Sequence, residues 1–391
     1  MQTGWFESVP PNGHVARPVE ATADNDNALG LAAPEPEIAI ETTPEHRNLV
    51  NGDPACVGWT RRRDDPGVLE RRATLQANNG IPDLEVFATG DIERATASFH
   101  RDGFVVIGDA VPAPRLAALQ AATDRVMRAT LAVDPDASAG GGAGGLPHRY
   151  SFGSTSASRH RLHEQAWVDM IDLPATTAIL TSIFGSADYI VGGGGGDYAL
   201  PGAIEYQGLH SDNVWTEIHD PVGGLTMRDL PVPVVTIMFP MIDLTWENGP
   251  IRQIPGTQRS NEPIPNIVDE PDSMKWSTVC PVPTGSAVIR DNRCWHGGTP
   301  NLSEDMRAMP NIEYYAPWFR SEGVNRCMPH EQWLTLSAHG RRISRYVAAA
   351  PGEVVLGAGF DHPRAAARDA FLEQQAAELG TDIADQWWSK R

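Results

Sequence analysis

The hydrophobic and polar positions first separate an irregular N-terminal part from the rest of the chain. Up to about residue 85, apolar residues follow neither the alternation of a strand nor the spacing of a helix, and Pro, Asn, Asp and Glu are frequent. We therefore expect residues 1–85 to form an extended or loosely packed arm. Within it, Pro66–Gln76 could form a short helix, because its apolar residues Val68, Leu69 and Leu75 are suitably spaced.

Regular elements begin near Asp91. The segment Asp91–Gly103 predicts a helix, with an acidic residue at its start and a glycine at its end. Phe104–Ile107 predicts a short buried strand. Pro112–Leu131 predicts a second helix because apolar residues recur on one face, at Leu116, Leu119, Ala122, Val126 and Ala129. The folded part of the chain therefore opens with a helix, a strand and a helix.

Two glycine runs interrupt this pattern, at residues 139–145 and 192–196. Glycine is the residue that holds a helix or strand least well. We predict flexible loops at both places, either plain surface loops or a lid over a site.

Residues 189–318 contain short apolar runs separated by Gly, Pro, Asn and Asp. The runs are YIV, AIEYQGLH, VPVVTIMFPMI, IRQIP, SAVIRD and MPNIEYYAPW. Several short strands at this spacing predict a sandwich or barrel. We expect a mainly β domain with flanking helices over residues 86–340.

The end of the chain returns to helical patterns, over residues 341–349 and 363–379. Asp361 is placed to cap the second helix, Pro363 lies in its first turn and Gly380 ends it. We expect residues 341–391 to form a helical extension packed on the β domain.

Composition and charge exclude several classes of protein. The hydrophobic share of 41% and the charged share of 21% are typical of a globular chain. The formal net charge of −19, with no long basic stripe, disfavours nucleic acid as a partner. The most apolar stretch, Val232–Leu244, is too short and too interrupted by proline to cross a membrane.

The cysteines and the start of the chain bear on location. Four cysteines lie far apart without a C-x-x-C pair, at Cys56, Cys280, Cys294 and Cys327. This pattern fits neither a disulfide framework nor a cysteine-rich zinc module, and favours a reducing compartment. The first residues lack the profile of a signal peptide. We expect a cytoplasmic protein.

His210, Ser211 and Asp212 end one of the apolar runs. Residues i and i+2 of a strand project to the same face, so the imidazole and the carboxylate can converge on one metal ion. Taken alone the H-x-D pattern is weak evidence, because a chain with 12 histidines matches it easily by chance.

His296 follows another apolar run and precedes two glycines. Together with His210 and Asp212 it would complete two histidines and one carboxylate, the facial triad that leaves positions on Fe(II) open. Arg307 follows on the next predicted strand. Its guanidinium could bind the far carboxylate of a dicarboxylic co-substrate through two hydrogen bonds, although alone it could equally form a surface ion pair.

These residues belong to an ordered set of motifs. The set consists of FHRDGFVVIGDAVPAPRLAAL from Phe99, QGLHSD, DLTWENGPIRQIPGTQRS from Asp243, and WHGGTPN followed by Arg307. Over roughly residues 91–320 the chain resembles the phytanoyl-CoA dioxygenase-like branch of the Fe(II)/2-oxoglutarate-dependent oxygenases. As an ordered set, the motifs are far more specific than any one of them.

The resemblance implies a double-stranded β-helix, a cupin-like jelly roll with the metal inside its mouth. It also implies Fe(II), 2-oxoglutarate and O₂ as cofactor and co-substrates. It assigns His210, Asp212 and His296 to iron and Arg307 to the distal carboxylate of 2-oxoglutarate. Further contacts to the co-substrate are implied for Gln207, Thr236 and Thr299, although both threonines could equally be ordinary strand and turn residues.

The chain departs from the family pattern in places. Thr257 and Gln258 stand where Ser-His is usual, which puts a role of that His in substrate recognition in doubt. Trp215 and Trp246 could wall an apolar pocket or fill a core. Five further residues could supply a second metal site and stay unassigned: His160, His163, Glu164, His219 and Asp220.

The resemblance implies a dioxygenase that oxidises, and we expect hydroxylates, a C–H bond of a small metabolite with release of succinate and CO₂. Asp212 disfavours a halogenase, in which a small residue replaces the carboxylate, but it does not separate hydroxylation from desaturation, epoxidation or endoperoxide formation. Two alternatives remain, a metal-dependent hydrolase on the same fold, which Arg307 disfavours, and a non-catalytic β-barrel binding protein. The negative charge disfavours a coenzyme A thioester and favours a neutral or amphipathic substrate.

Overall fold

The computed structural model describes residues 63–133, 149–152, 160–212, 220–319, 326–355, 357–359 and 365–380. Four features named above lie outside these residues: most of the predicted arm, the glycine run at 139–145, Trp215 with His219, and the predicted helix start at Asp361 and Pro363.

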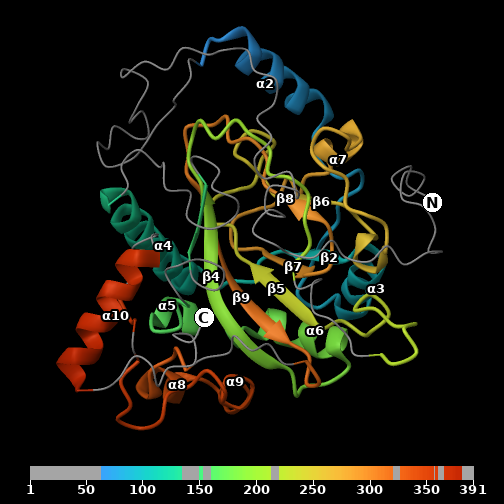
Figure 1. Ribbon diagram of the computed structural model, residues 1–391. Coiled ribbons are helices and arrows are strands. Elements are labelled where there is room, and N and C mark those ends of the chain that lie inside the picture. The colour runs from blue at the N-terminus through green and yellow to red at the C-terminus, as the bar shows by residue number, and fades with distance from the viewer. Residues whose placement is uncertain are drawn as a thin grey trace.

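A seven-stranded sheet forms the centre of the protein, in the order β1-β2-β7-β5-β9-β4-β3. All neighbouring strands are antiparallel except β1 and β2. Figure 1 shows β4, β9 and β5 of this main sheet lying side by side. Its strands are β1 (Val86–Phe87), β2 (Phe104–Ile107), β3 (Arg149–Phe152), β4 (Ile190–Ala199), β5 (Val234–Met238), β7 (Ala287–Asp291) and β9 (Arg307–Tyr315).

A smaller sheet lies against the inner face of the main sheet. It consists of β6 (Arg252–Gln253) and β8 (His296–Gly297), and a bridge from His210 to His296 extends it. The predicted strand over 203–210 forms only isolated bridges here. The two sheets make the double-stranded β-helix, and the predicted fold class is confirmed.

Successive side chains along each strand point alternately to the outer and to the inner face of the main sheet. On β9, Ala308, Ile312 and Tyr314 join a buried cluster with apolar residues of the helices. The alternate residues of β9, including Arg307 and Glu313, face inward. The same alternation on β5 and β7 turns polar groups toward the interior, where a site can form.

Helices cover the outer face of the main sheet and the ends of the fold. Figure 1 shows α4, α5 and α10 along one side of the sheet, with α7 beside the small sheet. The helices are α2 (Pro66–Asn78), α3 (Ile92–Asp102), α4 (Ala113–Val133), α5 (Gln165–Val168), α6 (Pro174–Phe184), α7 (Asp272–Trp276), α8 (His330–Thr335), α9 (Ala338–Ile343) and α10 (Ala365–Leu379), and a 3₁₀ turn spans Thr257–Arg259.

The predicted opening of the fold is confirmed. Helix α3 ends at Asp102. The next residue, Gly103, has φ of 84° and donates its backbone N–H to the carbonyl of Phe99, which caps the helix. Strand β2 and helix α4 follow at the predicted places.

The prediction of a flexible loop at residues 192–196 is wrong. All five glycines lie in β4, which pairs with β3 on one side and β9 on the other. Neighbouring groups leave no room for side chains: a Cβ atom at Gly196 would lie 2.7 Å from the Cα of Pro310. Glycine is therefore used here because other chain atoms approach the strand closely.

Residues 63–85 are packed, in contrast to the loosely packed arm expected through residue 85. The predicted helix forms as α2, and its side chains of Val68 and Leu75 are only 2% and 1% exposed. Arg71 donates to the carbonyl of Ile204, 2.8 Å away. Helix α2 thus belongs to the folded body of the protein.

The C-terminal part differs from its prediction in one helix. Helix α9 begins earlier than expected and ends at Ile343, so residues 344–349 are not helical. Helix α10 lies where the second helix was expected, and Gly380 follows it with φ of 65°.

Candidate metal centre

Three side chains converge between the two sheets. Ligand atoms of His210, Asp212 and His296 all lie within 4.8 Å of one another. The carboxylate of Asp212 is 4.0 Å from Nε2 of His210 and 3.4 Å from Nε2 of His296. Among the residues that the structure describes, this is the one such cluster of His, Cys, Asp and Glu.

Backbone hydrogen bonds hold the two histidines in register. The N–H of His210 donates to the carbonyl of His296 at 3.0 Å, and the reverse bond is 2.9 Å long. The N–H of Asp212 donates to the carbonyl of Asn292 at 2.7 Å. The spacing of the three side chains therefore follows from strand pairing.

The tautomers of the two imidazoles follow from their backbone partners. Nδ1 of His210 lies 3.1 Å from the carbonyl of Gly208, and Nδ1 of His296 lies 2.9 Å from that of Cys294. A carbonyl can only accept, so each Nδ1 carries the proton and each Nε2 keeps a lone pair. Burial lowers the pKa of His210 and holds the pKa of His296 well below its usual value.

Arg290 supports the carboxylate of Asp212. Its Nη2 donates to Oδ2 of Asp212 at 2.7 Å from the inner face of β7. The arginine side chain is 7% exposed and that of Asp212 29%. A charge-assisted bond at this depth fixes the direction of the carboxylate.

Arg307 lies at the start of β9 and is 3% exposed. Its Nε donates to the carbonyl of Gly249 at 2.9 Å. Its Nη1 is buried and has no hydrogen-bond partner among the described residues. Burial lowers the pKa of Arg307 to about 10, which leaves the guanidinium charged at neutral pH. A buried cationic donor without a partner is suited to an anionic ligand.

Arg149 is a residue near the site that sequence reasoning missed. Arg149 and Arg307 both pair with Ala199, from opposite edges of β4, so the two arginines share the inner face with only a methyl group between them. Arg149 donates to the carbonyl of Thr299, and burial followed by repulsion from Arg307 lowers its pKa to about 9. The signal in the sequence was faint, because Arg149 follows an irregular glycine-rich segment.

The three other predicted contacts are placed as follows. Oε1 of Gln207 accepts from the N–H of Gly298 at 2.9 Å, which leaves its Nε2 as a donor. The hydroxyl of Thr236 donates to Oδ1 of Asn292 at 2.7 Å. The hydroxyl of Thr299 donates to the carbonyl of Pro250 at 2.5 Å. Both threonine protons are therefore directed at protein oxygens.

The departures from the family pattern have structural roles. The hydroxyl of Thr257 accepts from the N–H of Trp295 at 2.9 Å, next to His296. Nε2 of Gln258 donates to the carbonyl of His100 at 3.1 Å and so reaches the last turn of α3. Trp246 is half-buried and packs against two apolar clusters.

The described residues of the second suggested metal site have other partners. Asp220 accepts backbone N–H groups of Val222, Gly224 and Leu225 and so caps a turn. Glu164 pairs with Arg125 and Arg161. They form no metal-binding cluster within the part of the chain described.

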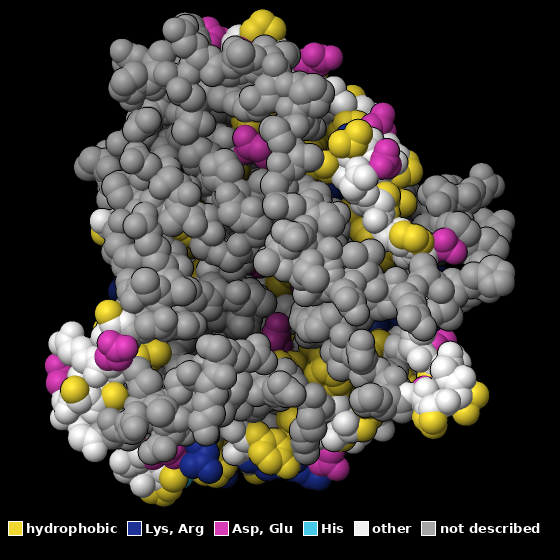
Figure 2. Space-filling view, in the orientation of Figure 1, with side chains coloured by type: hydrophobic (Ala, Val, Ile, Leu, Met, Phe, Trp, Pro, Cys, Tyr) yellow, Lys and Arg dark blue, Asp and Glu magenta, His cyan; other side chains and the backbone are white. Residues whose placement is uncertain are grey.

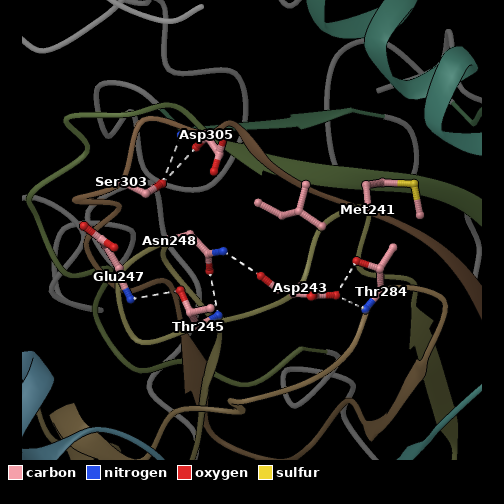
Figure 3. Close-up of a pocket in the computed structure, with 9 residues that line it drawn as sticks. Met241, Asp243, Thr245, Glu247, Asn248, Thr284, Ser303 and Asp305 are labelled. Carbon is pink, nitrogen blue, oxygen red and sulfur yellow. Dashed lines mark hydrogen bonds between the residues drawn. The ribbon is translucent and has the colours of Figure 1, made fainter.

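A cavity of about 490 Å³ lies apart from the triad, beside the loop that follows β5. Figure 3 shows that the residues lining it hydrogen-bond to one another, mostly between a side chain and a backbone group. Asp243 accepts from both the N–H and the hydroxyl of Thr284 at 2.7 Å, and Asn248 donates to the carbonyl of Asp243 at 2.7 Å. These hydrogen bonds hold the shape of the loop that follows β5.

The residues present fit both iron and 2-oxoglutarate. Two neutral imidazoles and a carboxylate are a donor set that Fe(II) accepts with positions left open. The buried, unpartnered Nη1 of Arg307 suits a carboxylate.

A family model described as phytanoyl-CoA dioxygenase matches residues 99–309, which is more than half of the chain. The match contains all three converging side chains and Arg307. The chain belongs to the phytanoyl-CoA dioxygenase family. It is a non-haem enzyme of the class that depends on Fe(II), 2-oxoglutarate and O₂.

Solved structures with a similar chain course include enzymes of this class. The epimerase SnoN from nogalamycin biosynthesis is 17% identical, with 57% of this chain and 80% of SnoN covered and a TM-score of 0.42. The carbocyclase SnoK from the same biosynthesis is 17% identical, with coverages of 60% and 90% and a TM-score of 0.40. EctD from S. alaskensis with bound Fe is 19% identical, with coverages of 61% and 83% and a TM-score of 0.39. These scores are low, so the family assignment stands on the sequence match.

The described surface adds two observations. In Figure 2, acidic side chains are spread around the visible face, while Lys and Arg gather at its lower edge, near α8 and α9. No described helix is both long and apolar enough to cross a membrane.

Proposed function

We propose that the protein hydroxylates a C–H bond of a small-molecule metabolite, with iron held by His210, Asp212 and His296. The observation that carries this proposal is the convergence of the three side chains inside the double-stranded β-helix. Bound iron, with 2-oxoglutarate and O₂, supplies the oxidising chemistry, and succinate and CO₂ are released.

The protein's own groups prepare the metal ligands. The carbonyls of Gly208 and Cys294 fix the tautomers, so both Nε2 atoms can bind the metal without first losing a proton. Arg290 keeps the carboxylate of Asp212 turned toward the two imidazoles. These partners reduce the reorganisation that metal binding requires.

Arg307 would hold the distal carboxylate of 2-oxoglutarate, since its Nη1 is buried and finds no acceptor in the described part of the chain. Arg149 adds a second positive charge on the same face of the sheet, and Gln207 can donate through Nε2. Contacts from Thr236 and Thr299 would require each hydroxyl to turn away from its present acceptor. A hydrolase has no use for the buried donor of Arg307, which favours the oxygenase.

The direct test removes the metal ligands. His210→Ala and Asp212→Ala should each lose Fe(II) binding and 2-oxoglutarate turnover while the protein keeps its fold, because each side chain supplies one of three ligands. Iron content, succinate formation and thermal unfolding are measured together. His100→Ala, which removes an exposed imidazole on α3, is the control. Normal succinate formation by a folded ligand variant would refute the assignment.

A further inference from the structure

A row of four residues crosses the inner face of the main sheet beside the triad. Strand register places Arg290, Thr236, Glu313 and Gly193 directly opposite one another on β7, β5, β9 and β4. Arg290 binds the metal-ligand carboxylate. Since neighbouring strands lie about 4.8 Å apart, the backbone of Glu313 is about 10 Å from that of Arg290. Glu313 is among neither the proposed iron ligands nor the proposed contacts to 2-oxoglutarate.

Gly193 opens space next to Glu313. A Cβ atom at this position would lie 2.0 Å from Cε1 of His160, so the imidazole packs directly on the strand backbone. The glycine thus allows His160 to wall the interior beside Glu313. This gives part of the glycine run a role in shaping the site.

The carboxyl group of Glu313 has little hydrogen bonding to the described residues. Among the described residues its carboxyl accepts from the hydroxyl of Tyr315, over a long 3.4 Å. Burial, followed by repulsion from Asp212, raises the pKa of Glu313 to about 7. A donor from a ligand would stabilise the ionised form.

An unused donor lies near this acceptor. Asn292 is 1% exposed, and its Oδ1 accepts from Thr236, the neighbour of Glu313 in the row. Its Nδ2 has no hydrogen-bond partner among the described residues. The carbonyl of Asn292 accepts from the N–H of Asp212, so this side chain also lies next to the metal ligands.

We propose that Glu313 and Asn292 form a subsite that binds a hydroxyl group of the prime substrate beside the iron. A hydroxyl can donate to Glu313 and accept from Asn292 at once, whereas an ammonium can only donate and an ether can only accept. The inference rests on the proposed function, because only a metal bound by the triad would make the space beside Glu313 the place where the substrate binds. His160 would limit the size of the group that enters.

The test uses small probes, with Zn²⁺ in place of iron and 2-oxoglutarate bound. Saturation-transfer NMR and titration measure the binding of cyclohexanol, cyclohexylamine, methoxycyclohexane and cyclohexanecarboxylate. Cyclohexanol should bind most tightly of the four, because it alone is both a neutral donor and an acceptor.

Variants then identify the subsite. Glu313→Leu and Asn292→Asp should each weaken cyclohexanol about tenfold, since each loses one hydrogen bond. Asn292→Asp keeps the oxygen that Thr236 binds and replaces the Nδ2 donor by a carboxylate oxygen, which cannot donate. Glu313→Gln keeps an acceptor and should weaken cyclohexanol less than Glu313→Leu. Glu331→Leu, on the exposed side of α8, is the matched control and should change nothing.

Three outcomes overturn the proposal: equal cyclohexanol affinity in wild type and Glu313→Leu, tighter binding of cyclohexylamine than of cyclohexanol, or no cyclohexanol binding to wild type. Calorimetric titration of 2-oxoglutarate into the same wild-type protein separates this failure from failure of the proposed function. If 2-oxoglutarate binds and the probes do not distinguish the variants, only the hydroxyl subsite is wrong.

Discussion

Arg290 connects the main sheet to the proposed metal ligands. It is a charged residue near the end of β7, with a side chain 7% exposed, and it donates to Asp212. Removing a group that orients a ligand acts on the metal through that ligand. Its contribution should therefore appear in metal affinity more than in folding.

We expect Arg290→Gln to weaken Fe(II) binding by roughly ten- to a hundredfold, because the carboxylate of Asp212 loses its charged partner. Competition with a chelator under anaerobic conditions measures the affinity. Arg259→Gln, at an exposed position, is the control. Unchanged iron affinity in Arg290→Gln would show that Asp212 holds its direction without help.

Arg307 should act on the co-substrate alone. Arg307→Ala is expected to weaken 2-oxoglutarate by roughly ten- to a hundredfold, since a charge-assisted bond contributes about 1.5–3 kcal/mol. Arg307→Lys keeps the charge but loses the planar pair of donors, and should lie between wild type and Arg307→Ala.

Calorimetric titration of 2-oxoglutarate into the anaerobic, iron-loaded protein measures this effect, and iron affinity should stay unchanged. Equal affinity of wild type and Arg307→Ala would speak against the clamp and return the metal hydrolase to consideration.

The sequence predicted which residues converge here but not what supports them. His210 and Asp212 are two residues apart, and motif order brought in His296 and Arg307. Arg149 depends on register across β4, which no local pattern reveals. Arg290 did have a local signal, a charge at an inward position of the run SAVIRD.

Strand β4 shows how packing can override residue preference. Glycine is unfavourable in a strand because it orders at a high entropic cost and packs no side chain. Pairing with β9, pairing of Gly196 with β3 as well, and close neighbouring side chains and backbone nevertheless hold residues 192–196 in the sheet. Helices α3, α4 and α10 and strands β2, β5, β7 and β9 were predictable from local patterns, whereas this strand depends on contacts far apart in the chain.

Gly196→Ala should destabilise the protein by about 1–3 kcal/mol, because its Cβ would press on the backbone of Pro310 and Met309, which cannot rotate away. Denaturant unfolding measures the change. Gly90→Ala is the matched control, since nothing lies within 4 Å of a Cβ there. Similar stability of the two variants would mean that β9 can shift without cost.

At the scale of the whole molecule, α2 ties the start of the described chain to the small sheet's side of the fold. Arg72 donates to the carbonyl of Leu302, and the N–H of Ile81 donates to the carbonyl of Thr278 at 3.2 Å. The sequence predicted this helix but not its packing on the fold, because its two buried side chains lie among many polar ones. Their packing partners come from distant segments.

A protein that starts at residue 86 should be less stable than one that starts at residue 63. Val68 and Leu75 each contribute about 1.5–3 kcal/mol through burial, and the hydrogen bonds of α2 add to this. Thermal and denaturant unfolding of the two truncated proteins measure the difference. Equal stability of the two proteins would show that the packing of α2 does not stabilise the fold.

The glycine strand also has a genetic consequence. Every amino-acid change that one base substitution makes in a glycine codon introduces a Cβ atom. At Gly192, Gly193, Gly194 and Gly196 that atom would lie less than 3.0 Å from a neighbouring ring, side chain or backbone. Single substitutions at these four positions are thus disfavoured, most strongly at Gly196, where the Cβ atom would meet backbone atoms. Among descendants of this gene, we expect the run to stay fixed while the sequence around it diverges.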